Sequence, residues 1–413
     1  MFQCNSLSLR SLAQKLAGHS FWILVQKFLR QTTAIAATMA LVRQFDAEQF
    51  GLYQLIVTCV ALAGFFALPG MNMAVIQSVA RGFDGTFRSA NRWSFRSSFL
   101  GSAALLLCSG WHWFSGSSDA AIAFVVAAVL FPLSAGLTIW QSFYDGKQQF
   151  RQAALIMGGI FTMGNGLIVT GFFVGWNQIW IPVFFTYFVL AAVNSFMTLH
   201  TSKRVSESLS PESGLMAYGF RTSIYGLANI AANHLDRLLL FFLISPEVMA
   251  VFILGERFPE LAKKNLQSLT RALVPEFSRK TRYTETLEKK IKLLGLVMAL
   301  VIVFVAVAVV PWLLPILFTD AYSDSVLICQ LLLFSLILGL QATVKFSYVQ
   351  AHMDERGFRN VTLIMSFSRI LFSLVLVPFF GAIGAALSSI LYRVVTYSVV
   401  DYHLKKHHSH VEA

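Results

Sequence analysis

The chain has 413 residues, of which 56% are hydrophobic and only 13% are charged, with a formal net charge of +12. Soluble proteins carry about 45–50% apolar and about 25% charged residues, so this composition excludes a soluble enzyme. The apolar stretches repeatedly exceed 18 residues, which marks membrane-spanning helices, whereas a transmembrane β-barrel needs short alternating segments. We therefore expect an all-α integral membrane protein.

At about 20 residues for each span, the chain holds about twelve transmembrane helices. The first apolar stretch is too long for a signal-peptide core, and we interpret it as a retained helix. Charged residues interrupt the eighth stretch, which makes it the least apolar of the twelve. The predicted spans are 18–41, 53–79, 94–114, 119–143, 153–175, 179–199, 218–244, 248–272, 292–317, 325–350, 360–379 and 382–402.

Lys and Arg residues between the spans predict the orientation. With the N-terminus in the cytoplasm, the cytoplasmic segments hold 22 of these residues and the outer loops hold only Arg43. Cytoplasmic loops carry such an excess of Lys and Arg in membrane proteins. The distribution predicts a multi-pass protein with both termini in the cytoplasm, and most of its basic residues serve orientation and attraction to bilayer lipid.

Two pairs of similar segments lie six spans apart and indicate an internal repeat. Residues 150–157 (FRQAALIM) resemble residues 358–365 (FRNVTLIM), and residues 48–53 resemble residues 247–252 more weakly. Because six is even, the two halves share one orientation, as in transporters built from parallel repeats. We expect six-helix lobes related by a pseudo-two-fold axis. The predicted parts are an N-terminal lobe 1–199, a cytoplasmic linker 200–217, a C-terminal lobe 218–403 and a cytoplasmic tail 404–413.

Several charged residues fall inside the apolar spans, where a charge costs at least ~2.5–3.5 kcal/mol near the bilayer centre. Bases outnumber acids in this set. The bases are Lys27, Arg30, Arg237, Arg257, Lys263, Lys264, Lys345, Arg369 and Arg393, and the acids are Asp236, Glu256 and Glu260.

The first span gives the clearest functional signal among these bases. Lys27 and Arg30 are three residues apart, so they share a helix face, and no acid is near them on that helix. Arg30 lies about 18 Å into the span. Fixed cations in a low dielectric suit an anionic group, and Arg binds phosphate through two parallel hydrogen bonds. We interpret the pair as lining a cavity.

The other buried charges leave two interpretations open. On the eighth span Arg257, Glu260 and Lys264 follow one stripe, and Glu256 and Lys263 follow the next, which fits either a substrate seam or internal pairs. Glu260–Lys264 and Asp236–Arg237 are the candidate internal pairs. The Lys345 side chain is expected to extend to the headgroups. Arg369 and Arg393 either line a second groove or neutralise the Glu residues.

No motif for cofactor chemistry is present in the sequence. It contains no GxxxxGK[ST] loop, no zinc-ligand spacing and no nucleophile elbow, and its cysteines have no metal-ligand spacing. The chain is expected to need no cofactor, to bind no nucleic acid and not to be an enzyme.

Four motifs follow one another along the chain. They are residues 50–53 (FGLY), Asp236-Arg237, residues 273–278 (LVPEFS) and residues 378–386 (PFFGAIGAA). In this order they resemble the motifs of the polysaccharide flippases, the O-antigen (Wzx-type) exporters, whose superfamily also includes multidrug and toxin extrusion transporters and the lipid II flippase. Residues 249–252 (MAVF) depart from the family's glycine-containing element at that place.

The resemblance implies a substrate, an oligosaccharide on undecaprenyl pyrophosphate, turned across the bacterial inner membrane by alternating access. The substrate-binding candidates are Lys27, Arg30, Arg237, Arg257, Lys263, Lys264, Arg369 and Arg393. Asp236, Glu256 and Glu260, or the neighbouring His234, are the candidates for coupling to an ion gradient. The resemblance also implies a glycan polymerase and a chain-length regulator as partners.

Two other functions remain open. A multidrug or other small-molecule exporter of the same superfamily would favour an acidic cavity for cationic drugs, which the excess of bases does not provide. A membrane-embedded sugar polymerase or glycosyltransferase usually needs a sizeable outer loop, and the predicted outer loops are short.

Overall fold

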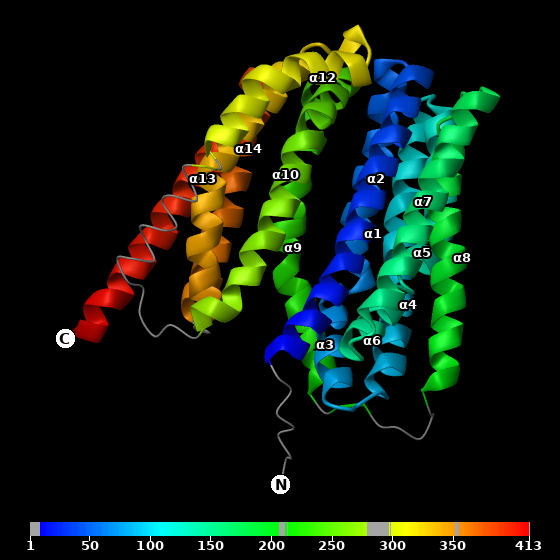
Figure 1. Ribbon diagram of the computed structural model, residues 1–413. Helices are drawn as coiled ribbons and strands as arrows, with labels where there is room; N and C mark the ends of the chain where they lie inside the picture. Colours follow the sequence, from blue (N-terminus) through cyan, green and yellow to red (C-terminus); the bar gives the residue numbers. More distant parts are fainter. Residues whose placement is uncertain are drawn as a thin grey trace. The chain divides into compact units, whose positions relative to one another are not determined.

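The computed structural model describes residues 9–205, 211–212, 214–278, 297, 299–351 and 355–412, and these residues contain helices and no strand (Figure 1). The predicted loop between spans eight and nine has most of its basic residues between Arg279 and Lys292, and these lie outside the described residues. The helices are α1 (Leu9–Gln44), α2 (Ala47–Ala63), η1 (Gly64–Ala67), α3 (Gly70–Ala80), α4 (Thr86–Phe114), α5 (Ser118–Ser134), α6 (Ile139–Gly146), α7 (Phe150–Val174), α8 (Trp180–Arg204), α9 (Leu215–Leu239), η2 (Leu240–Ile244), α10 (Pro246–Ser278), η3 (Val305–Val309), α12 (Val310–Leu317), η4 (Asp320–Tyr322), α13 (Ser325–Ala351) and α14 (Glu355–Glu412).

The helices form two compact units. Unit 1 comprises Met1–Gln44 and Ile56–Leu227, and unit 2 comprises Phe45–Leu55 and Ala228–Ala413. The chain passes from one unit to the other after Gln44, then within α2 and again within α9, since α2 and α9 each contribute residues to both units.

The all-α membrane class predicted from composition is confirmed. Seven helical segments among the described residues are long and apolar enough to cross a membrane. The count of twelve spans stays a prediction. The seven segments are Ala47–Ala67, Ser118–Gly146, Phe150–Val174, Trp180–Arg204, Leu215–Ile244, Ala299–Leu317 and Leu363–Tyr402.

The second predicted span, 53–79, is not one continuous helix. It breaks between η1 and α3, where Leu68 has a left-handed φ of 52° and Pro69 follows. A residue before proline is disfavoured in the right-handed helical region, and proline also lacks the N–H that a continuous helix needs. The break therefore follows from Pro69.

The fourth predicted span, 119–143, breaks as well, between α5 and α6. Carbonyl groups at the end of a helix have no partner within it. Here α8 supplies the donors: the Asn194 amide donates to the Ser134 carbonyl at 2.8 Å, and the Thr198 hydroxyl donates to the Leu137 carbonyl at 3.1 Å. Polar residues of one helix thus satisfy the broken backbone of its neighbour.

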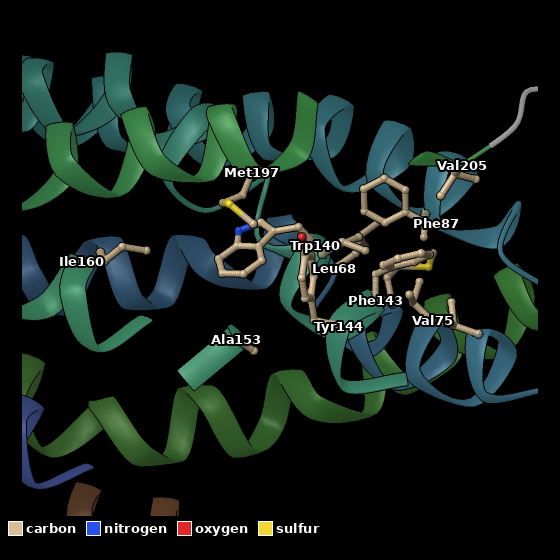
Figure 2. Packing of buried hydrophobic residues seen from close by; sticks show 14 of the residues in the cluster. Leu68, Val75, Phe87, Trp140, Phe143, Tyr144, Ala153, Ile160, Met197 and Val205 are labelled. Atoms are coloured by element: carbon tan, nitrogen blue, oxygen red, sulfur yellow. The ribbon is translucent and has the colours of Figure 1, made fainter. Parts of the chain in front are cut away.

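A cluster of buried apolar and aromatic side chains from several helices forms the core of unit 1 (Figure 2). Trp140 of α6 is fully buried there, and its indole N–H donates to the Asn194 side-chain oxygen at 2.9 Å. Phe87 and Phe143 pack edge to face with 5.4 Å between ring centroids. The buried aromatic rings fix α6 against α4 and α8.

The predicted linker is attached to unit 1 through Glu212. Its carboxylate accepts a hydrogen bond from Arg81 at 2.8 Å, and its backbone N–H donates to the Thr86 hydroxyl at 3.0 Å. The Arg81 guanidinium lowers the pKa of the Glu212 carboxyl below its usual value. Arg88 adds bonds to the carbonyls of Ser202 and Val205, both at 2.8 Å.

A tight turn at Gly381 divides α14 into two antiparallel helices, as the sequence predicts between spans eleven and twelve. Gly381 has φ 55° and ψ −133°, a conformation that favours glycine. A Cβ on Gly384 would lie 2.2 Å from the Leu376 carbonyl oxygen, so the two helices touch through backbone just after the turn.

The FGLY motif packs the start of α2 onto the turn that opens α10, within unit 2. A Cβ on Gly51 would lie 2.2 Å from the Pro246 carbonyl oxygen, so only glycine fits this contact. The fully buried Phe50 ring packs edge-on against Tyr322 at 6.2 Å. The motif therefore has a packing role.

Candidate functional site

A cluster of charged side chains lies within unit 2, on α9, α10 and the two halves of α14. It contains most of the residues that the sequence marks as functional. We call it the unit 2 charge cluster; it consists of Asp236, Arg237, Glu256, Arg257, Glu260, Lys263, Lys264, Arg369 and Arg393.

The turns that connect successive helices bring residues far apart in the sequence close together in this cluster. Arg369 and Arg393 each lie twelve residues from Gly381, so both are about 18 Å from the turn at 1.5 Å per residue. Arg237 lies eight residues before the turn at Ser245, and Glu256 lies eleven residues after it. In both hairpins, therefore, charged residues of the two helices lie at comparable distances from the turn.

Asp236 pairs with Arg369 of α14. The Asp236 side chain is almost fully buried, and one carboxylate oxygen accepts a hydrogen bond from Arg369 at 3.3 Å. Arg369 also donates to the Asn233 side-chain oxygen at 2.6 Å. The sequence alternative in which Asp236 pairs with its neighbour Arg237 is wrong, because consecutive residues point to different faces of a helix.

Arg237 pairs instead with Glu256 of α10. Its Nε and one terminal nitrogen both donate to the same Glu256 oxygen, at 3.2 and 2.8 Å. Both side chains are mostly buried. A double hydrogen bond between a guanidinium and a carboxylate fixes the orientation of both groups and joins α9 to α10.

Lys264 and Glu260 form the pair that their spacing predicts. The Lys264 amine lies 2.8 Å from a Glu260 carboxylate oxygen, four residues away on α10. The Lys264 side chain is 57% exposed, so we assign this contact little weight in stability.

Three bases of the cluster have no ion pair with an acid in the part of the chain that the structure describes: Arg257, Lys263 and Arg393. The buried Nε of Arg257 also lacks a hydrogen-bond partner among these residues. Arg393 reaches the Ser335 carbonyl at 3.4 Å and lies over the buried Tyr392 ring at 5.7 Å. With three acids already paired, the surplus of positive charge lies on these bases, and it suits an anionic group.

Lys27 and Arg30 belong to unit 1, on α1, and are not among the residues of the unit 2 charge cluster. The Arg30 guanidinium lies 4.0 Å from the centre of the Phe161 ring of α7, while the side chain stays exposed. One turn further along, the Asn165 amide donates to the Thr33 hydroxyl at 3.1 Å. These contacts hold the basic face of α1 against α7.

Lys345 corrects a prediction. We expected its amine to extend to the headgroups, but the residue is only 5% exposed. The amine forms an ion pair with Asp401 and donates to the Tyr397 hydroxyl at 3.2 Å. The acid that makes burial possible comes from α14, far away in the sequence.

Two residues of the site were missed by sequence reasoning. Both contact Arg369: the Asn233 side-chain oxygen accepts a hydrogen bond from it, and the Tyr392 ring lies under its guanidinium, with 5.2 Å between Cζ and the ring centre. Neither is charged, and a polar or aromatic residue in an apolar span is common. The only signals in the sequence are that Asn233 lies one helical turn before Arg237 and that Tyr392 directly precedes Arg393.

Metal binding finds no support in the described residues. No group of three or more His, Cys, Asp and Glu side chains there could hold a metal ion.

The sequence profile of one protein family, described as "Polysaccharide biosynthesis protein", matches residues 40–327. No sequence among curated proteins matches the chain.

Solved structures of membrane transporters share the fold. An outward-facing multidrug resistance MATE family transporter of the MOP superfamily has 14% sequence identity and a TM-score of 0.65, with 95% of each chain covered. The lipid II flippase MurJ, in an inward closed conformation, has 14% identity and a TM-score of 0.65, with 93% of this chain and 87% of that chain covered. A MOP superfamily transporter from Pyrococcus furiosus, reported with a binding pocket of reverse polarity, has 14% identity and a TM-score of 0.58, with 94% of each chain covered.

Proposed function

The chain belongs to the polysaccharide biosynthesis protein family, and we propose that it is a flippase for lipid-linked oligosaccharides. In this proposal the substrate is an oligosaccharide repeat unit, of O-antigen, capsule or exopolysaccharide, on undecaprenyl pyrophosphate. The protein turns it from the inner to the outer leaflet of the bacterial inner membrane, with both of its own termini in the cytoplasm. A glycan polymerase and a chain-length regulator are the proposed partners.

The surplus of bases in the unit 2 charge cluster is the observation that carries this proposal. Six bases against three acids leave a net positive charge at a depth where charges are costly. A pyrophosphate group has to cross the same low-dielectric region, and buried guanidinium groups lower that cost. We propose that Arg257, Lys263 and Arg393 contact the pyrophosphate directly.

Transport by alternating access fits a protein of two units, since rocking of one part against the other exposes a site to each side in turn. Ion coupling through Asp236, Glu256 or Glu260 stays a proposal. Each of these acids forms an ion pair with a different base, so a coupling ion has to compete with that base for the carboxylate.

A multidrug exporter is the second candidate, because MATE transporters share the fold. The surplus of bases opposes it, since cationic drugs require acidic partners. A competition assay separates the two: the flippase is inhibited by polyprenyl diphosphates, whereas a drug exporter is inhibited by organic cations.

The paired bases of α1 give one test of the flippase proposal. We expect Lys27→Ala with Arg30→Ala to abolish surface glycan display, while lipid-linked intermediates accumulate on the cytoplasmic side. The control is Thr32→Ala, which changes an exposed residue of the same helix whose hydroxyl donates to the Phe28 and Leu29 carbonyls of that helix. Normal display in the double variant would remove α1 from the substrate path.

Topology is tested independently with reporter fusions. A reporter fused after Arg204 is expected to be cytoplasmic, and one fused after Asp320 periplasmic, because of the excess of Lys and Arg between the predicted spans. Alkaline phosphatase and green fluorescent protein fusions measure the two locations. The reverse pattern would contradict the proposed orientation.

A further inference from the structure

Three exposed arginines and two aromatic side chains gather at the start of α4 and α9 in unit 1. Arg92 and Arg96 are one helical turn apart on α4, and Arg221 lies on α9. We call this surface the α4–α9 patch; it consists of Arg92, Trp93, Arg96, Phe220 and Arg221.

Packing fixes the two helices of the patch to each other. Trp93 and Phe220 meet edge to face, with 6.1 Å between ring centroids, and both remain partly exposed. α9 is held on α3 by a hydrogen bond from the Gly70 N–H to the Ser223 hydroxyl at 2.9 Å. The packing of α4 and α9 therefore holds the arginines next to this aromatic pair on one surface.

Exposed aromatic residues indicate the depth of the patch in the membrane. Trp111, Trp113 and Phe114 are exposed at the other end of α4, and Trp93 precedes them by 18 to 21 residues. This separation is about 27–32 Å along a helix, close to the ~30 Å thickness of the hydrocarbon core. Tryptophan is enriched at both interfaces. With α4 as the predicted third span, and in the orientation proposed above, Trp93 and Arg92 therefore lie at the level of the cytoplasmic headgroups, and Arg96 lies slightly deeper.

No acid neutralises the patch from its own helices. α4 contains no Asp or Glu, and the first acid of α9 is Asp236, fifteen residues beyond Arg221. The acids next to the helix starts are occupied: Asp84 pairs with Lys147 at 2.7 Å, and Glu212 pairs with Arg81 at 2.8 Å. In the described residues none of the three arginines has an ion pair, so the patch keeps its positive charge.

We propose that the α4–α9 patch is a docking site for the diphosphate group of a polyprenyl lipid in the cytoplasmic leaflet. This inference rests on the proposed function for its substrate, and it adds a second site, outside the unit 2 charge cluster, where the lipid is captured before transport. Guanidinium groups bind phosphate oxygens through two parallel bonds. Arg92 and Arg96, about 5–6 Å apart at Cβ, engage the two neighbouring phosphates, and Arg221 adds charge from α9. A phospholipid diester offers only one such phosphate. The aromatic rings pack against the first isoprene units.

The test uses the purified full-length protein and farnesyl diphosphate as the probe. Native mass spectrometry resolves how many molecules each protein carries, so binding at the patch is separated from binding elsewhere. We expect Arg92→Gln with Arg96→Gln to weaken one binding step at least tenfold and to leave any other step unchanged. The matched control, Lys203→Gln with Arg204→Gln, removes two exposed cytoplasmic charges of α8 and is expected to change each step less than twofold.

Two further measurements cover a double variant that does not fold and a phosphate that comes from a phospholipid. Arg221→Gln alone is expected to weaken the same step about threefold, which provides a reading if the double variant does not fold. Phosphatidylglycerol is expected to bind the patch at least tenfold more weakly than farnesyl diphosphate. Equal weakening in the α8 control, or equal affinity for phosphatidylglycerol, would overturn the proposal. If the Arg92→Gln, Arg96→Gln variant loses this binding step but displays glycan normally, the patch binds the lipid but has no role in transport. If variants of the unit 2 charge cluster lose display but still bind farnesyl diphosphate at the patch, the result concerns only the proposed function.

Discussion

Replacing Arg257 and Lys263 together by glutamine is expected to reduce surface glycan display to below about a hundredth of the wild-type level. Neither residue has an ion pair with an acid in the described part of unit 2, so both are available to a substrate anion. A hydrogen bond to a charged group contributes about 1.5–3 kcal/mol. The loss of two such bonds amounts to at least ~3 kcal/mol, which is more than a hundredfold in affinity.

Lys264→Gln is the matched control for this double variant. Lys264 lies next to Lys263 on α10, but it is mostly exposed and pairs with Glu260. We expect it to retain more than half of the wild-type display. Display is measured by glycan staining of whole cells, together with the amount of protein in the membrane and of lipid-linked intermediates. Equal display in the two variants would show that Arg257 and Lys263 have no special place in the substrate path.

The second large effect is expected from Arg369→Gln, through stability. Removing this base leaves the Asp236 carboxylate buried without its counter-charge, at 2% side-chain exposure. Breaking one side of a buried ion pair costs about 3–5 kcal/mol. We expect the unfolding free energy of the detergent-solubilised protein to fall by about that amount.

Adding Asp236→Asn to Arg369→Gln tests the cause. The double variant has no unpaired buried charge, and neutral pairs of similar size are tolerated, so its stability is expected to return to within about 1 kcal/mol of wild type. Asn233→Ala, which removes a neutral hydrogen-bond acceptor of Arg369, serves as a comparison and is expected to cost about 1 kcal/mol. An unchanged unfolding free energy in Arg369→Gln would contradict the pair. Failure of Asp236→Asn to restore stability would assign the loss to packing.

Contacts within one helix, and a turn with its own residue signature, were predictable from the sequence. Glu260 and Lys264 are four residues apart, and the geometry of a helix places such residues side by side. The turn at Gly381 was predictable because residues 378–386 (PFFGAIGAA) resemble the turn motif between the last two spans of the polysaccharide flippases, and the structure has a positive φ there. In both cases the information lies within a few residues.

Contacts between helices were not predictable. Arg369 reaches Asp236 over 133 residues of sequence, and Lys345 reaches Asp401 over 56. The prediction that Lys345 extends to the headgroups failed because its acid lies on another helix. Periodicity gives the face on which a residue lies, but it does not give the rotation of that face or the helix that packs against it.

The sequence by itself determined that this is an α-helical membrane protein with costly charges inside its spans and more bases than acids among them. Hydropathy and charge are properties of the residues, and they persist in any fold. Only the tertiary structure decided which bases are neutralised. Arg237 and Arg369 are paired across helices, whereas Arg257, Lys263 and Arg393 keep no acid among the described residues. The physical reason is that an ion pair forms at about 3 Å, so the packing of helices, rather than the number of charges, determines where positive charge remains for the proposed anionic substrate.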